Sequence, residues 1–164
     1  MKAFWHAKWL QQVSIRQQAE TKLSDLQDAQ MRMKEQIEQY TDNMDSIWNM
    51  RQQEGLSAKQ AYSTRLNELM MQNPNMSDSE RMMNMNMMQQ MQSNIDAYMS
   101  TFKTSFENAK KAALKPLQEM DKNFEKKIKR AEQDEQIARQ REEDYKKKDE
   151  ESNKRMYGNG SANA

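Results

Sequence analysis

Apolar residues recur in steps of three, four and seven along the first third of the chain. The regular positions are Leu23, Leu26, Met33, Ile37, Tyr40, Met44 and Ile47. This spacing is a heptad seam, so it predicts a helix over residues 3–54. The same register extended backward takes in Trp5 and Trp9, but also the polar Gln12, Arg16 and Gln30. We therefore expect a helix packed in a bundle rather than a self-sufficient dimeric coiled coil.

Short sequence signals between residues 55 and 80 predict where helices end and begin. Gly55 is a natural C-terminal cap, and "SAKQ" at 57–60 has the form of a capping box, so a short second helix is expected over 58–72. The "QNPN" around Pro74 ends it. A second capping-box pattern, "SDSE" at 77–80, predicts the start of a long third helix.

The seam of this third helix shifts partway along. Its first apolar set is Met88, Met91, Ile95, Tyr98, Phe102 and Ala109. A second set on a different stripe consists of Ala113, Leu117, Met120, Phe124 and Ile128. Pro116 lies at the changeover, and a proline inside a helix removes one backbone hydrogen bond. A kink or break is predicted near 112–116.

Beyond residue 130 apolar residues nearly vanish, and only Ile137 and Tyr145 stand out among charged side chains. The pattern indicates three regions. Residues 1–130 are expected to form a helical bundle or coiled-coil region, 131–157 a solvated charged helix, and 158–164 a disordered tail.

Composition narrows the fold class to all-α. The chain contains a single Val and three Gly, which leaves little from which to build strands and hairpins. Hydrophobic residues make up 35% of its 164 residues, less than usual for a globular domain. We expect an elongated helical hairpin of two long helices and one short helix. Its core must be thin or shared with other chains.

Methionine supplies much of the apolar volume, since ten of the 17 methionines lie between residues 70 and 99. Met82, Met85, Met88 and Met91 share one side of a helix, with Met83, Met87 and Met76 widening it. Thioethers suit Cu(I), but neither His nor Cys accompanies them, so we expect no metal. A groove that adapts to apolar clients is one alternative. Burial between subunits is the interpretation we favour, and it extends to Ile95, Tyr98 and Phe102.

A second candidate interface lies near the N-terminus, where Trp5, Trp9 and Val13 follow one another at helical spacing with Phe4 beside them. Aromatic anchors of this kind dominate protein interfaces. Docking on a partner is therefore expected here. Core packing and contact with a membrane surface are the alternatives.

The distribution of charged residues indicates one further candidate binding surface. The net charge is +1, but residues 103–130 hold nine basic residues against four acidic ones. The basic patch consists of Lys110, Lys111, Lys115, Lys122, Lys126, Lys127, Lys129 and Arg130. Phosphate contacts would need a sustained basic surface, and the acidic stretch that follows weakens this interpretation. A solvated helix face is expected, with nucleic-acid binding as the alternative.

The sequence lacks the residue combinations that usually form an active site. His6 is the single histidine, Cys is absent, and the three glycines form no phosphate-binding loop. We expect no catalytic residues and no cofactor. The apolar run at the start of the chain is too short for a signal peptide, and no run reaches the ~20 apolar residues of a membrane span. A cytoplasmic origin is expected.

Together these patterns predict a non-enzymatic structural or assembly protein that binds other proteins and copies of itself. It would be a helical subunit of a larger particle, such as an internal, scaffolding or connector protein of a phage virion, or part of a secretion apparatus. The alternatives are a helical adaptor or chaperone with a Met-rich groove, and a binder of nucleic acid or membrane surfaces.

Overall fold

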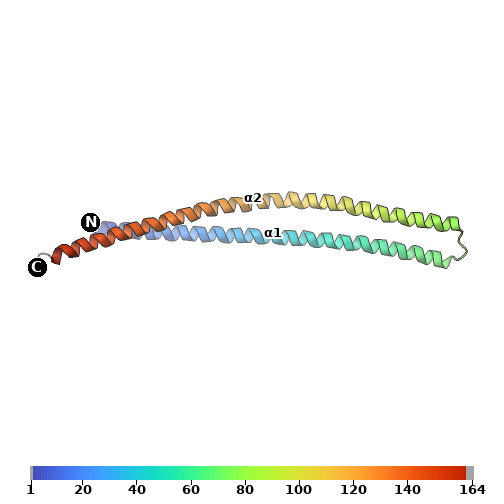
Figure 1. Ribbon diagram of the computed structural model, residues 1–164, viewed down its shortest axis with the longest axis horizontal. Helices are drawn as coiled ribbons and strands as arrows, with labels where there is room; N and C mark the ends of the chain where they lie inside the picture. The colour runs from blue at the N-terminus through green and yellow to red at the C-terminus, as the bar shows by residue number, and fades with distance from the viewer. Residues whose placement is uncertain (1, 162–164) are drawn as a thin grey trace. The chain divides into compact units, whose positions relative to one another are not determined.

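The computed structural model describes residues 2–161, and over this range the chain forms two helices (Figure 1). They are α1 (Lys2–Gln72) and α2 (Asp78–Ser161), and no strand occurs between residues 2 and 161. The prediction of an all-helical protein in which helices pack together is confirmed. Of the predicted tail, residues 158–161 belong to α2, and residues 162–164 lie outside the described range.

The two helices form two compact units. The terminal unit consists of the described residues within Met1–Glu35 and Leu117–Ala164, and the turn unit is Gln36–Pro116. In each unit, residues with higher numbers on α1 pair with residues that have lower numbers on α2. The two helix segments of each unit therefore run antiparallel. The pairs are His6 with Asp149 and Gln30 with Asp121 in the terminal unit, and Asp45 with Lys110 and Lys59 with Asp96 in the turn unit.

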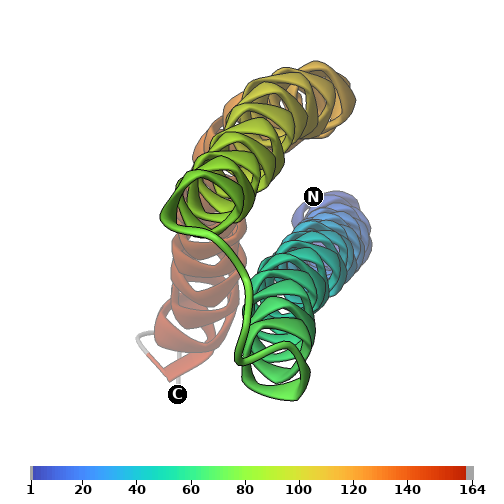
Figure 2. The ribbon, with the colours of Figure 1, turned by 90° about the vertical axis from the view of Figure 1, so that its right-hand side faces the viewer.

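Residues 73–77 join the helices at the end of the turn unit (Figure 2). The Met76 N–H donates to the Asn73 carbonyl at 3.1 Å, which closes the turn. The predicted capping box at the start of α2 is confirmed. The Glu80 N–H donates to Ser77 Oγ at 3.2 Å, and the Ser77 N–H donates to Glu80 Oε2 at 3.3 Å. Both donors would otherwise lack a partner within the helix.

Removing this cap gives a first test. Ser77→Ala is expected to lower the free energy of unfolding by about 1 kcal/mol, because the Glu80 N–H loses its acceptor. Ser57→Ala is the matched control, since Ser57 lies in the interior of α1, where alanine is the better helix former. Urea denaturation followed by circular dichroism measures both. Equal effects of the two substitutions would show that the capping box contributes nothing.

The predicted helix end at Gly55 and the separate helix over 58–72 are wrong, because α1 runs unbroken through both. Gly55 does not adopt the positive φ of a C-terminal cap. It lies where α1 meets α2 in the turn unit, and a Cβ added there would sit 3.1 Å from Met99 Sδ. The missing side chain thus gives room to Met99, a role that the local sequence does not reveal.

Helix α2 likewise continues through Pro116, so the predicted break is wrong and a kink is not shown. A proline costs an interior helix one backbone hydrogen bond. Here that loss does not end the helix.

The core is thin. Within the described residues, the buried hydrophobic side chains are Leu66 in the turn unit and Met33, Ile128, Ala131 and Ala138 in the terminal unit. The sequence predicted a solvated charged helix over 131–157, and the structure adds a packed face to it. Ala131 and Ala138 are only 3% and 4% exposed, while the larger Ile137 is 49% exposed. The packed face of this stretch therefore passes through its small side chains.

The seam of the turn unit departs from the predicted register at Trp48. Ile47, predicted on the stripe, is exposed. Trp48 instead packs across to α2, with its ring 6.0 Å from Phe102 and 6.1 Å from Phe106. The heptad repeat predicted a step of three from Met44 to Ile47, but the packed residue is Trp48, four residues after Met44. This irregularity shifts the phase of the seam along the helix.

Candidate interaction surfaces

The predicted N-terminal face is partly used inside the terminal unit. The half-buried Trp5 ring lies 6.0 Å from Tyr145 on α2, and Lys148 Nζ lies 5.0 Å from the first ring and 5.3 Å from the second. Phe4 meets Trp5 edge to face at 5.1 Å but is 54% exposed. A cation between two aromatic rings stabilises this contact. Phe4 is therefore mainly exposed to solvent, whereas Trp5 is half-buried.

The next turn of α1 places a polar cluster against α2. His6 Nδ1 lies 3.3 Å from Asp149 Oδ2, and the His6 ring packs edge to face on Trp9 at 5.4 Å. Trp9 and Val13 are half-buried. Asp149 is 7% exposed, and its Oδ1 has no hydrogen-bond partner among residues 2–161. A buried carboxylate oxygen without a partner is costly.

A shallow hollow of about 400 Å³ adjoins this cluster. Its lining residues are Trp5, Lys148, Glu151, Ser152, Arg155 and Met156. One acidic and two basic side chains surround it, so its charge is mixed.

Two of the three polar residues that interrupt the predicted seam, Arg16 and Gln30, have partners on α2. Arg16 hydrogen bonds Glu142 across the two helices and Glu20 at 2.8 Å, and Glu20 also accepts from Arg139 at 3.0 Å. These bonds, that to Glu142 foremost and that to Glu20 next, raise the pKa of Arg16 above its ordinary value. The bond to Glu135 likewise raises the pKa of Arg139. Side chains of opposite charge therefore link the two helix segments of the terminal unit, at positions where apolar residues would be expected.

Gln30 is paired as well, because its Nε2 donates to Asp121 Oδ1 at 3.3 Å. Polar contacts of this kind at an apolar seam favour one register of the two helices over its neighbours. Gln12, the third interruption, is half-buried, and its Oε1 has no hydrogen-bond partner among the described residues.

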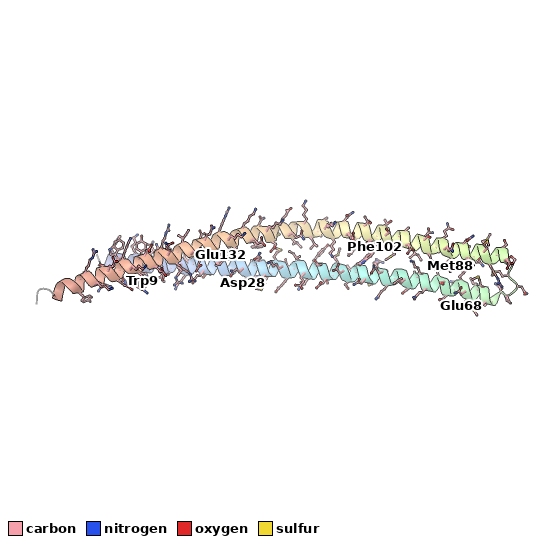
Figure 3. The ribbon with its side chains drawn as sticks, viewed as in Figure 1. Trp9, Asp28, Glu68, Met88, Phe102 and Glu132 are labelled. Carbon is pink, nitrogen blue, oxygen red and sulfur yellow. The ribbon has the colours of Figure 1, made fainter. Side chains whose placement is uncertain are left out.

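The methionine-rich part of α2 lies in the turn unit, and its side chains face several directions. Met88 and Ile95 are half-buried at the seam. Phe102, also on α2 (Figure 3), stacks on Trp48. Helical spacing then places the remaining predicted interface residues on two different flanks of the seam, Met82 and Met85 on one and Met91 and Tyr98 on the other. All four are exposed.

Sequence reasoning missed three residues that organise these contacts: Trp48, Glu142 and Asp149. The step of four that brings Trp48 to the seam was visible, but a three-residue step to Ile47 fitted the repeat better. Glu142 and Asp149 looked like members of a charged run. Only their pairing with Arg16 and His6 distinguishes them.

The predicted basic patch has members in both units. In the turn unit, Lys110 is half-buried and pairs with Asp45 at 2.6 Å. The other members are exposed, namely Lys111 and Lys115 in the turn unit and Lys122, Lys126, Lys127, Lys129 and Arg130 in the terminal unit. Lys127 Nζ lies 6.0 Å from the Phe124 ring.

Over residues 2–161, no group of three acidic or histidine side chains is placed to hold a metal ion. Neither helix, as far as it is described, contains a stretch apolar enough to cross a membrane.

Comparison of the chain with protein-family models, with curated proteins and with solved structures found no match.

Proposed function

We propose that this protein is a non-enzymatic assembly subunit, a helical component of a larger multi-subunit particle. The observation that carries the proposal is that the turn unit exposes many more large apolar side chains than it buries. Only Leu66 is buried among its described hydrophobic residues, while many large ones are exposed. These are Ile47, Met50, Leu56, Leu69, Met71, Met82, Met83, Met85, Met87, Met91 and Tyr98.

The free energy available from covering these side chains supports the same proposal. Full burial of a methionine is worth roughly 1.5–3 kcal/mol. Covering several half-exposed methionines would therefore stabilise the protein by an amount comparable with the stability of a small domain. Contact with other subunits is the direct way to achieve this.

Particles built from helical rods, including the internal, scaffolding or connector layers of a virion and the accessory parts of a secretion apparatus, are the contexts we propose. An adaptor or chaperone that holds apolar clients would use the same methionines. The two functions differ in stoichiometry, because a structural subunit has a fixed copy number and a chaperone has exchanging clients.

Sedimentation from the native source tests the proposal. The tagged full chain, produced at its natural level, is expected to move with a large particle, and quantitative mass spectrometry should find the same ratio of chain to partner across the peak. A chain that sediments alone would contradict the proposal. Many clients at variable ratios would favour the chaperone function instead.

A further inference from the structure

The two sides of the turn unit differ in charge. On one side of its seam, Asp45 pairs with Lys110 and Lys59 with Asp96, so this side is called the charged face. On the opposite side, Arg51 lies 5.6 Å over the Phe102 ring. Helical spacing places Arg51 on the opposite side of α1 from Asp45, and its contact with Phe102 agrees with this placement.

The α2 part of this opposite side lacks charge over about thirty residues. Steps of three and four from Met83 lead through positions that are all uncharged, beginning with Met83, Met87, Met91, Asn94, Tyr98 and Thr101 and continuing to Ala112. The charged residues of α2 between 81 and 112 fall outside this stripe. They are Arg81, Asp96, Lys103, Glu107, Lys110 and Lys111.

The neighbouring flank of α1 is also poor in charge. Ile47 and Leu69 are exposed on it, and Tyr62 is half-buried. Its charges are Arg51 and Glu54, which form an ion pair at 2.9 Å, and Arg65. Together the two flanks form what is called here the uncharged face of the turn unit, a name taken from its α2 flank.

We propose that the uncharged face binds the same face of a second copy of this chain, so that two turn units form a four-helix bundle. In a two-fold interface each patch meets itself, and a patch with charges of one sign would meet like charges. This face has little of that repulsion, because its α2 half has no charge and Arg51 and Glu54 on its α1 half offset each other, which leaves Arg65. Unbranched methionines also repack easily against one another.

The size of the face agrees with such a partner. Thirty helical residues span about 45 Å, and two adjacent helices are about 20 Å wide. The resulting face of about 900 Å² is close to the roughly 800 Å² that each partner contributes to a stable interface. This inference rests on the proposed assembly function and identifies one of its contacts.

A matched pair of double variants tests the proposal. Met83 and Met87, on the uncharged face, are 64% and 50% exposed, and Met82 and Met85, on the other flank, are 67% and 49% exposed. M83E/M87E is expected to weaken the dimer about a hundredfold or more, because charges would be buried in the interface. M82E/M85E should leave the dimer intact, and M83L/M87L should preserve it.

Light scattering of the purified full chain over a concentration series measures the mass. Twice 19.5 kDa is expected for the wild type and for M82E/M85E, and the monomer mass for M83E/M87E. Circular dichroism checks the helix content. If M83E/M87E does not fold, Tyr98→Glu on the uncharged face and Ser100→Glu on the opposite flank provide the same comparison.

A monomeric wild type would overturn the inference. So would equal weakening by M83E/M87E and M82E/M85E, or a mass above that of the monomer that M83E/M87E leaves unchanged. A wild type that is monomeric when purified but sediments at fixed stoichiometry in a particle would refute the dimer alone. A chain that sediments alone in its native source would refute the assembly function separately.

Discussion

Trp48→Ala is expected to lower the free energy of unfolding by about 2–3 kcal/mol. Replacing a buried tryptophan by alanine costs roughly 3–5 kcal/mol, and Trp48 is half-buried, so a lower value applies. Its stacking on Phe102 and its contact with Phe106 are lost as well. The turn unit has only one buried hydrophobic residue, so few other contacts can compensate.

Leu56→Ala is the matched control, because Leu56 lies on the same helix outside the uncharged face and is exposed. It should change the free energy of unfolding by less than about 1 kcal/mol. Urea denaturation of both variants, monitored by circular dichroism at one protein concentration, measures the difference. Similar losses would show that the seam does not pass through Trp48.

Asp149→Leu is expected to raise the free energy of unfolding by about 1–3 kcal/mol. The Asp149 carboxylate is buried with one oxygen near His6 and the other without a partner among the described residues. Replacing such a group by an apolar one removes the cost of its desolvation. Leucine is also a better helix former than aspartate.

Glu150→Leu serves as the control for Asp149→Leu, since the adjacent Glu150 is exposed and its replacement buries nothing. Thermal unfolding at one pH and protein concentration compares the two variants. A loss of stability in Asp149→Leu would mean that the carboxylate makes a favourable interaction in the folded protein. His6 would then become the first residue to test for that interaction.

The helical class and the start of α2 were predictable because their causes are local. Composition excluded a sheet, and Ser77 and Glu80 carry the capping signal within four residues of sequence. The role of Gly55 was not predictable in the same way. A glycine that ends a helix and one that admits a distant side chain look alike until Met99 is placed beside it.

The candidate surfaces were predicted in part. The sequence identified the methionine-rich segment, but which methionines share a flank depends on the phase of the seam, and the step at Trp48 shows that this phase shifts. Over 131–157 the difficulty was different. Ala131 and Ala138 carry little hydrophobic signal, and Arg16 with Glu142 fills a packed position with charge, so the packed face was hidden among polar residues.

The distribution of indole rings gives each unit its own optical signal. Trp5 and Trp9 belong to the terminal unit, and Trp48 is the one tryptophan of the turn unit. With the first two changed to phenylalanine, fluorescence would come from Trp48 alone. Its emission would then follow the melting of one unit without interference from the other, and its quenching by iodide would report whether the neighbouring surface is covered.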